Sequence, residues 1–311
     1  MSVSLIIGAG GQDGRLLSHH LKSKGETVLE MGRGWVRDLR GTESPVNLMN
    51  GTEVASLISE TKPDRIFYLA AFHHSSSQKE LKQDQEIWGR SISTHVEGWR
   101  NILEGVAIHR PQAALFYAAS SLVFGSPERG SQNEESSLNP VCIYGITKTM
   151  GVHLSRFYRN EKGLRVNVGF LYTHESPLRG VAFVAKKIVT ELKEVAAGIR
   201  KKVILGDLSA EVDWGYAPDF VTAMDLITQR EQADDYIVAT GEAHSVGEFA
   251  QVACQVLGLD FYAVVEEDPN RLVRKKRNLV GDGSKLRKLT GWKPSLTFVG
   301  MVQKLVRHEG A

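Results

Sequence analysis

Cysteine, charge of one sign and long apolar runs are all scarce in this sequence, and each scarcity excludes a class of protein. Only two of the 311 residues are cysteines, so no disulfide framework is needed and a reducing compartment is expected. The formal net charge is +2, with lysine and arginine spread along the chain, which argues against a nucleic-acid-binding protein. No apolar stretch reaches the roughly 18–20 residues of a membrane span, and no signal peptide is expected. The composition therefore predicts a cytoplasmic protein without a membrane or nucleic-acid partner.

No metal site is expected either. Adjacent histidines occur at 19–20 and 73–74, but neighbours on a helix diverge by about 100°, and no pair has the spacing typical of metal ligands. The one basic run, "RLVRKKRN" at 271–278, has two interpretations. It is either a solvated surface segment or an edge that binds phosphate, in which case Arg271 would contact a substrate.

Short apolar runs alternate with longer segments of helical period, which is the pattern of βα units. This pattern predicts an α/β fold with a Rossmann-like, doubly wound parallel sheet. Residues 1–172, with a contribution from 214–240, would bind a dinucleotide, and 173–213 with 241–311 would form a smaller, substrate-binding part. The expected strands are 3–8, 27–31, 65–71, 114–120 and 164–172, and the expected helices are 12–24, 51–61, 85–108, 144–161 and 181–198.

The stretch "GAGGQDG" follows the first expected strand and opens a helix. In this context Gly8 would make the tight turn, Gly11 would let the backbone approach a pyrophosphate, and Gly14 would permit close helix–strand packing. A dinucleotide site is therefore favoured over a βα turn that binds nothing.

The end of the second strand bears on the choice of cofactor. An acidic residue there holds the ribose 2′-hydroxyl of NAD, whereas an arginine accommodates the 2′-phosphate of NADP. Gly32 stands at the acidic position and Arg33 follows it, which favours NADP. NAD stays open, because Glu30 would take the acidic role if the strand ended two residues earlier.

Tyr144 and Lys148 in "YGITK" are four residues apart and lie on one face of an expected helix. A nearby ammonium would lower the pKa of the phenol from about 10, so that Tyr144 could exchange a proton with a substrate hydroxyl. Ser120, at the end of the fourth expected strand, could hydrogen-bond the same oxygen. The three residues are the expected catalytic group.

These motifs together resemble the signature of the short-chain dehydrogenase/reductase superfamily, in its extended form that acts on nucleotide sugars. Further stretches are similar to one family, GDP-mannose 4,6-dehydratase, over essentially the whole chain. The most specific are "HESPLRG" (174–180) and "DWGYAPDFV" (213–221), supported by "YLAA" (68–71) and "GWKPSLTF" (291–298).

The resemblance implies a nucleotide-diphosphate sugar of the GDP-linked class as substrate and NADP as cofactor. It also implies a homodimer built on the helix of Tyr144 and the long helix before it. The residues implied to line the cofactor are Gly8, Gly11, Gln12, Asp13, Gly14, Arg33, Asn47, Leu48, Leu69, Ala70, Ala71, His73, Lys148, His174 and Arg179. The residues implied to face the sugar nucleotide are Ser121, Glu175 and Lys187.

The sequence also departs from the family pattern, most importantly at Leu122, where the family has a catalytic glutamate. Val212 replaces an arginine, Thr173 and Asn47 replace an asparagine and an aspartate, and "VCIY" (141–144) replaces "RSPY". The segment after Arg33 is shorter than the family loop that builds a tetramer.

Leu122 bears on the reaction, because dehydration needs an acid and a base at C5 and C6 of the sugar, and leucine cannot transfer a proton. The favoured interpretation is hydride transfer at C4 alone, as in a 4-epimerase or a 4-keto reductase. The first alternative is dehydration with a substitute group: His73, His74, Cys142 or Glu175. The second, from another class, is a regulator that senses NADP without catalysis, although such proteins generally lose the tyrosine or the lysine.

Overall fold

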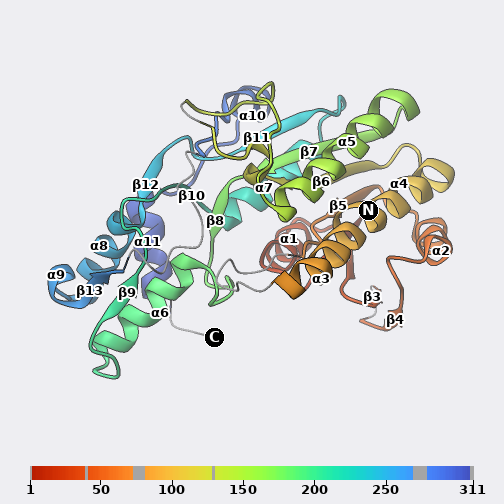
Figure 1. Ribbon diagram of the computed structural model, residues 1–311. Coiled ribbons are helices and arrows are strands. Elements are labelled where there is room, and N and C mark those ends of the chain that lie inside the picture. Colours follow the sequence, from red (N-terminus) through yellow and green to blue (C-terminus); the bar gives the residue numbers. More distant parts are fainter. Residues whose placement is uncertain (1, 39–40, 73–80, 128–129, 269–278, 309–311) are drawn as a thin grey trace.

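The computed structural model describes residues 2–38, 41–72, 81–127, 130–268 and 279–308, with residues 81–84 described as backbone only (Figure 1). An eight-stranded sheet with helices on both faces forms the larger part of the molecule. Two small sheets and their helices lie at one end of it. No helix in the described ranges has both the length and the apolar character needed to cross a membrane.

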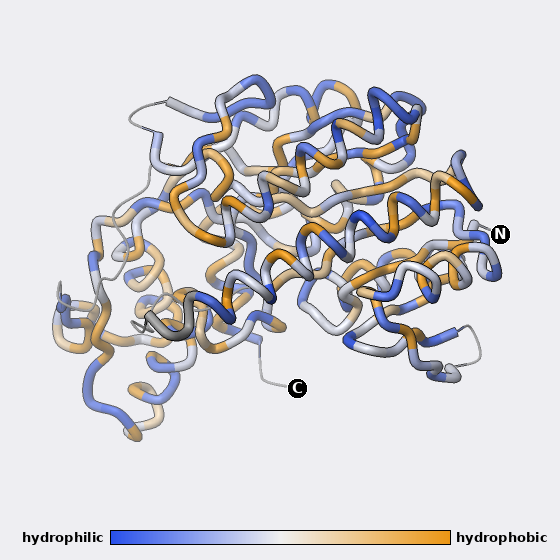
Figure 2. Tube along the Cα trace, turned by 45° about the vertical axis from the view of Figure 1, so that its right-hand side comes forward, coloured by the Kyte–Doolittle hydropathy of each residue, from blue (hydrophilic) through white to orange (hydrophobic). Residues whose placement is uncertain are grey.

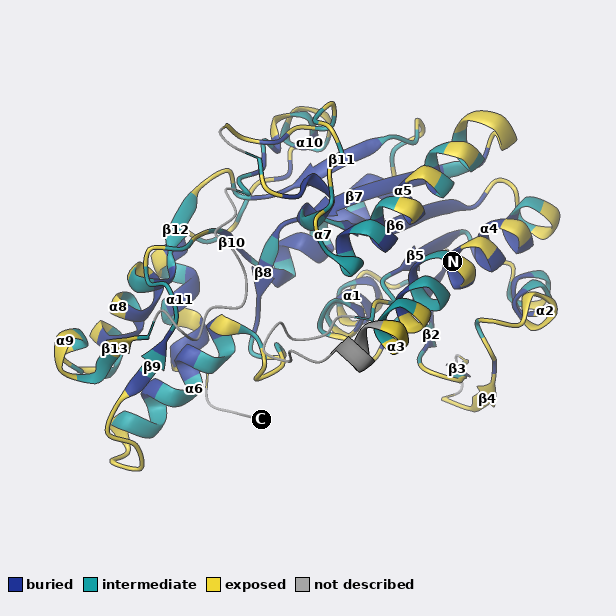
Figure 3. Ribbon diagram, viewed as in Figure 1, coloured by how far each residue is buried: buried dark blue, intermediate teal, exposed yellow. Residues whose placement is uncertain are grey.

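The large sheet has the strand order β11-β7-β6-β5-β1-β2-β3-β4, and its strands from β11 to β2 run parallel. Most of these strands are apolar on both faces, as a parallel sheet covered by helices requires, and β6 and β7 are dark blue in Figure 3. The predicted fold class is confirmed. The five expected strands are present as β1 (Val3–Ile7), β2 (Thr27–Met31), β5 (Arg65–Tyr68), β6 (Ala114–Ser120) and β7 (Arg165–Leu171).

Three strands of the large sheet were not expected. β3 (Trp35–Arg37) and β4 (Glu43–Pro45) continue from β2 as antiparallel strands at one edge, and β11 (Asp235–Val238) forms the other edge. Strands of three or four residues are too short to show an alternating pattern, so their pairing depends on contacts made after the chain has folded.

Alternate residues of each central strand face opposite cores. On one face Ile6, Phe67 and Phe116 pack towards α1 (Gln12–Ser23) and α7 (Ala217–Thr228). On the other face lie α2 (Gly51–Thr61), α4 (Gly98–His109) and α5 (Ile143–Lys162). Hydrophobic and hydrophilic residues alternate along these helices in Figure 2, as expected for helices with one buried face.

The single helix expected over 85–108 is divided into three. α3 (Leu81–Ile92) passes into one π turn, η1 (Ser93–Glu97), and then into α4. A π turn widens the helix by one residue and releases carbonyl groups from the regular ladder. The carbonyls of Thr94 and His95 accept hydrogen bonds from the hydroxyls of Tyr68, at 2.5 Å, and Tyr117, at 3.1 Å. The carbonyl groups that the π turn releases are therefore hydrogen-bonded by side chains of strands β5 and β6.

The smaller part is built around a separate core. β10 (Glu211–Tyr216) pairs with β8 (Thr173–Glu175) and β12 (Ala243–Ser245), and β9 (Val203–Leu205) pairs with β13 (Val265–Glu267). The chain passes back into the large sheet between β10 and β12, through α7 and β11. Its helices are α6 (Val184–Ala196), α8 (Val246–Leu257), α9 (Phe261–Val264) and α11 (Phe298–Arg307), while α10 (Ser284–Thr290) packs beside α7 and β11.

The close approach of α5 to β6 yields a stability prediction. A Cβ atom at Gly151 would overlap the hydroxyl of the buried Tyr117. We expect Gly151→Ala to lower the free energy of unfolding by about 1–3 kcal/mol, the usual cost of overpacking a core. Urea unfolding measures this change. Gly89→Ala is the matched control: its Cβ would meet no atom within 4 Å, and it should raise stability by about 0.5–1 kcal/mol, as for an unconstrained helical glycine. Equal stabilities of the two variants would contradict the prediction.

Candidate active site

The segments that carry the predicted site residues meet at the carboxyl ends of the parallel strands. The glycine-rich turn follows β1, Arg33 follows β2, and residues 69–72 follow β5. Ser120 ends β6, and β8 follows β7. In open α/β sheets this edge, beside the point where the strand order reverses, is where ligands bind.

The glycine-rich turn has the tight packing that the spacing predicts at Gly8 and at Gly14. Gly8 has φ +94°, and a Cβ there would lie 2.7 Å from the amide nitrogen of Ala70, so this position requires glycine. A Cβ at Gly14 would overlap the carbonyl of Gly8. At Gly10, by contrast, a Cβ would meet nothing within 4 Å. The backbone is therefore open to an approaching group at Gly10, at the N-terminus of α1.

Arg33 lies exposed in the turn between β2 and β3, whose ends are joined by a hydrogen bond from the Gly32 amide to the Trp35 carbonyl, 2.9 Å. Glu30, the alternative ribose ligand, is already engaged. It accepts hydrogen bonds from Ser18 at 2.5 Å and Lys22 at 2.6 Å. Burial raises the pKa of Glu30, but these two partners outweigh it and hold the pKa below the ordinary value. Arg33 is thus exposed at this strand end, whereas the carboxylate of Glu30 is engaged by other side chains.

Lys148 is buried on α5, and its ammonium donates a hydrogen bond to the Ala118 carbonyl at 2.8 Å. Its Nζ lies 5.0 Å from the ring centre of Tyr117 and 5.8 Å from that of Tyr144. Burial lowers the pKa of Lys148 to about 7. Proton gain and loss at this lysine therefore fall near neutral pH.

The expectation that an ammonium lowers the pKa of Tyr144 is not met. Burial raises the pKa of Tyr144 well above 10, and Asp13 adds to this effect, while Arg179 opposes it. The reason is that Lys148, desolvated itself, does not offset the loss of water around the phenol.

Leu122 lies beside the first turn of α5. Its amide donates to the hydroxyl of Ser120 at 3.3 Å, which opens the 3₁₀ turn η2 (Ser121–Phe124). A Cβ at Gly145 would lie 2.6 Å from the Leu122 carbonyl, so this turn packs directly against the helix next to Tyr144. The turn therefore places a half-buried leucine, without proton-transfer chemistry, at the start of the helix that carries Tyr144.

His174 and Asp13 form an ion pair across the molecule. Nε2 of His174 lies 3.0 Å from Oδ2 of Asp13, and Nδ1 donates to the Tyr172 carbonyl at 2.6 Å. Burial opposes the charge on both groups, but each partner outweighs it, so the pKa of Asp13 is lowered and that of His174 raised. Gln12 adds a link by donating to the His174 carbonyl at 3.3 Å. The first turn of α1 and strand β8 are thereby held together.

Glu175, next along β8, is buried with an unsatisfied oxygen. Only 2% of the residue is exposed, and Oε2 has no hydrogen-bond partner. Nε of Arg179 lies 3.5 Å from it, also without a hydrogen bond. Burial raises the pKa of Glu175 to about 7, against the opposing effect of Arg179. A buried carboxyl of this kind is uncommon in a folded core and typical of a functional site.

The other predicted site residues lie on several different elements. Ser121 is buried in η2, and Leu69, Ala70 and Ala71 follow β5 beside the glycine-rich turn. Asn47 accepts a hydrogen bond from the Met49 amide ahead of α2, Leu48 lies against Gly98, and Lys187 on α6 reaches the Ile204 carbonyl at 3.4 Å. Arg271, His73 and His74 lie outside the described residues. Val212 pairs with His244 in the small sheet and packs into its core.

Two further residues of this site were not predicted. His95, in the π turn, and Thr147, on α5, are buried and hydrogen-bonded to each other beneath Tyr144. Nothing in their local spacing distinguishes them from core residues. Within the described ranges, no group of three or more histidine, cysteine, aspartate or glutamate side chains could hold a metal ion.

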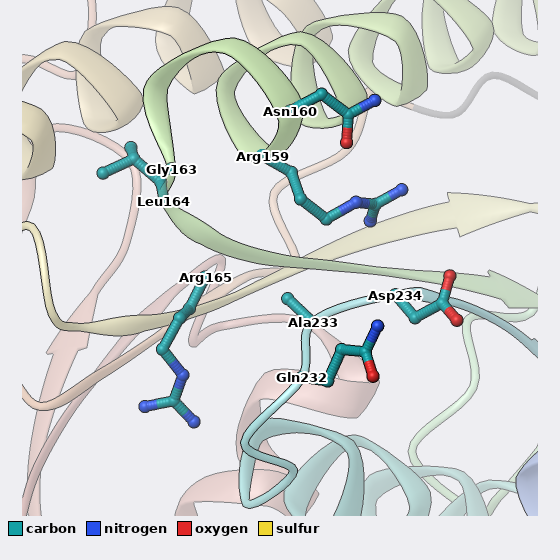
Figure 4. Close-up of a pocket in the computed structure, with 8 residues that line it drawn as sticks. All are labelled: Arg159, Asn160, Gly163, Leu164, Arg165, Gln232, Ala233 and Asp234. Atoms are coloured by element: carbon teal, nitrogen blue, oxygen red, sulfur yellow. The ribbon is translucent and has the colours of Figure 1, made fainter.

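A shallow pocket lies at the opposite end of the sheet (Figure 4). Its residues come from the end of α5 and from the segments that lead into β7 and β11, including Arg159, Arg165 and Asp234. Arg159 is paired with Asp235 at 2.9 Å, and Arg165 donates to the Arg230 carbonyl at 2.8 Å. It lies at the amino ends of the strands, and these arginines are already bonded, so we do not assign the activity to it.

The fold and this arrangement of residues are those of the extended short-chain dehydrogenase/reductases, enzymes that modify nucleotide sugars. Within that class the chain belongs to the GDP-mannose 4,6-dehydratase family, whose model matches residues 5–305. GDP-mannose 4,6 dehydratase 2 of Arabidopsis thaliana is 34% identical over 334 residues, which cover 99% of this chain and 86% of the plant protein. The resemblance found in the sequence is thus confirmed.

Solved structures have the same fold. The structure of RMD from Pseudomonas aeruginosa complexed with NADPH superposes with a TM-score of 0.82, at 18% identity and 98% coverage of both chains. A dTDP-glucose 4,6-dehydratase from Bacillus anthracis in complex with NAD superposes with a TM-score of 0.81, at 19% identity, covering 99% of this chain and 96% of the other.

Proposed function

We propose that this protein is an NADP-dependent 4,6-dehydratase of a GDP-linked hexose, in which Glu175 performs the proton transfer that Leu122 cannot. The observation that carries the proposal is the buried Glu175 carboxyl, whose Oε2 has no hydrogen bond. The family and its 34% identical plant relative favour dehydration over the C4 redox chemistry expected from the sequence. Dehydration is therefore the first candidate function, and hydride transfer at C4 alone, which the sequence favoured, becomes the second.

The residues at the carboxyl edge fit a nicotinamide dinucleotide. The backbone at Gly10 is open where a pyrophosphate would approach, and α1 starts two residues later with its N-terminal amides. Arg33, exposed after β2, would contact the 2′-phosphate, while Glu30 is engaged by Ser18 and Lys22. When bound, the nicotinamide would supply reversible hydride transfer.

Arg33→Ala tests the choice of cofactor. Removing the guanidinium should weaken NADP binding by about 10–100-fold, the effect of one charge-assisted hydrogen bond, and leave NAD binding close to wild type. Fluorescence titration with NADPH and NADH measures both affinities. Arg307→Ala, which removes an exposed arginine on α11, serves as the control. An equal loss for both cofactors in Arg33→Ala would rule out a 2′-phosphate contact.

In the proposed reaction, Tyr144 takes the proton of the sugar O4 hydroxyl in its ionised form, and Ser120 hydrogen-bonds the same oxygen. Burial alone keeps the phenol protonated, so the ionised form requires a charged Lys148 and the positive charge that an oxidised nicotinamide would add beside it. Nζ of Lys148 lies 5.8 Å from the centre of the tyrosine ring, and its pKa of about 7 allows it to give up or take on a proton as the phenol changes its protonation state. The carbonyl that forms at C4 makes the C5 proton acidic.

Elimination then needs a base at C5 and an acid at the C6 hydroxyl. The carboxylate of Glu175 takes the C5 proton, and the same group returns a proton as the C6 hydroxyl leaves as water. Return of the hydride to C6 and addition of a solvent-derived proton at C5 would then complete the product. A carboxyl whose pKa is about 7 is suited to both steps near neutral pH. Arg179, at 3.5 Å, stabilises its ionised form.

The remaining features of the proposal concern the substrate and the assembly. Ser121, Lys187 and Arg271 would contact the sugar nucleotide. Residues 1–172 and 214–240 would bind the cofactor. Residues 173–213 and 241–311 would bind the substrate. We propose a homodimer formed through α4 and α5, because Met150 and Phe157 are exposed on α5 at 41% and 48%.

The second candidate function is hydride transfer at C4 without loss of water. It is favoured by Leu122, because the turn from Ser120 to Gly125 holds no acidic side chain while Ser120, Tyr144 and Lys148 are all kept. A 4-epimerase or 4-keto reductase would need only these three residues.

Mass spectrometry of GDP-mannose incubated with the protein and NADP in heavy water separates the two functions. A dehydratase gives a product that has lost water and gained one deuterium at C5. An unchanged mass, together with exchange or reduction at C4 of other GDP-sugars, would establish C4 redox chemistry. Binding of NADPH without turnover of any GDP-sugar would indicate the regulator.

A further inference from the structure

The π turn η1 packs against α5, the helix of Tyr144 and Lys148. π turns are rare and occur frequently at functional sites, since the widened turn redirects a side chain. Here the redirected side chain is His95, which is fully buried. Its carbonyl and that of Thr94 are bonded by Tyr117 and Tyr68, so both strands beneath the turn hold it in this form.

The hydrogen bonds of His95 determine its tautomer. Nε2 lies 3.0 Å from the backbone nitrogen of Phe72, which can only donate, so Nε2 accepts. Nδ1 lies 2.8 Å from Oγ1 of Thr147. In the neutral ring Nδ1 then carries the proton and donates it to the threonine.

Thr147 passes this connection to the helix. Its hydroxyl lies 3.0 Å from the Ile143 carbonyl and 3.2 Å from the Tyr144 carbonyl, to which it donates. The His95 ring also contacts the Tyr144 ring edge-on, with centroids 5.1 Å apart and planes at 84°. The π turn therefore contacts Tyr144 in two ways. Thr147 links His95 to the backbone of α5, and the His95 ring contacts the Tyr144 ring directly.

The other end of the connection is the segment that follows β5. Phe72 comes directly after Leu69, Ala70 and Ala71, and Ala70 contacts the Gly8 turn. His95 therefore bridges the wall proposed to hold the cofactor and the helix that carries the proton-transfer residue.

We propose that His95 is a positioning residue, which holds the Tyr144 hydroxyl in register with the cofactor wall through Thr147 and the Phe72 amide. The proposal rests on the proton-transfer role of Tyr144, which dehydration and C4 redox chemistry share. A displacement of about 1 Å at a reacting group can cost about 100-fold in rate.

Three substitutions separate the parts of this arrangement. His95→Phe keeps the ring contact with Tyr144 and loses both hydrogen bonds. His95→Asn keeps a donor near Nδ1 for Thr147, and His95→Gln keeps an acceptor near Nε2 for Phe72. We expect His95→Phe to lower kcat by about 10–100-fold per NADPH-binding site, with KM and NADPH affinity near wild type, and His95→Asn to recover most of the loss.

A double-mutant cycle and an activity-independent signal complete the test. Thr147→Val combined with His95→Phe should be no slower than the slower single variant, because both changes break one connection. With 3-fluorotyrosine labelling, the ¹⁹F resonance that is absent in Tyr144→Phe should shift in Thr147→Val, which breaks the connection and keeps the His95 ring, but not in His109→Asn, an exposed control at the end of α4.

A structural role alone would lower the unfolding temperature and the number of NADPH-binding sites while leaving kcat per site unchanged. That result, or additive effects in the cycle, would overturn the proposal. If wild-type protein turned over no GDP-sugar, the proposed function would fail, and the Tyr144 resonance would still test the positioning role. An unchanged resonance in Thr147→Val refutes that role, and a shifted one supports it.

Discussion

Tyr144→Phe is expected to lower kcat by about 10²–10⁴-fold, the range typical of losing a general acid–base group. The variant lacks only the hydroxyl proposed to take the proton from the sugar O4. Its ring would keep the edge contact with His95, and Lys148 would keep its bond to the Ala118 carbonyl. NADPH affinity should therefore stay near wild type. Steady-state kinetics and fluorescence titration measure the two quantities.

Tyr158→Phe is the matched control for this substitution. Tyr158 lies on the same helix and packs its ring against the core on the α2 and α4 side of the large sheet, away from the predicted site. The control should leave kcat unchanged. Full activity in Tyr144→Phe would exclude Tyr144 as the proton-transfer residue in either candidate reaction.

Glu175→Gln is expected to lower the rate of water loss by about 10²–10⁴-fold, while exchange of hydride at C4 continues. Glutamine has nearly the same shape but cannot take up the C5 proton. Because the carboxylate is the active base, the wild-type rate should rise with pH through about 7, and this rise should be absent in the variant. The pH profile of product formation, followed by mass spectrometry, measures this.

Stability and rescue serve as controls for Glu175→Gln. The fold raises the pKa of Glu175, so its contribution to stability is fully present below the unfolded value and is lost as pH rises through about 7. The glutamine variant should therefore be at least as stable as wild type at pH 8, and unfolding cannot explain its loss of rate. Leu122→Glu in the glutamine background should restore part of the elimination. Unaltered water loss in Glu175→Gln would show that another group is the base.

The parts of this structure that were predictable depend on local patterns. Apolar runs between helical segments mark β1, β5, β6 and β7, and the glycine spacing marks the turn at Gly8 and Gly14, whose tight packing the structure confirms. The family resemblance then predicted that the C-terminal part binds the substrate, because the motifs "HESPLRG" and "DWGYAPDFV" are long enough to be specific.

The parts that escaped prediction depend on contacts between distant residues. The pairing of His174 with Asp13 joins residues 161 apart, and the link of His95 to Thr147 joins residues 52 apart. The direction of the Tyr144 pKa was wrong because it depends on how far α5 is buried, which spacing does not reveal. Glu175 was a candidate from its motif, but its unsatisfied oxygen is visible only in three dimensions.

The return of the chain to the large sheet through α7 and β11 has a consequence for how such a protein can be recombined. β7 precedes β8, β9 and β10 in the sequence and β11 follows them, but β7 and β11 pair with each other in the large sheet. A single crossover between two related genes after residue 172 would therefore combine one parent's sheet with the other parent's edge strand and covering helix. Exchange of the whole smaller part between relatives would need three junctions, before β8, before α7 and after β11, so that its shared core comes from one parent and the large sheet from the other.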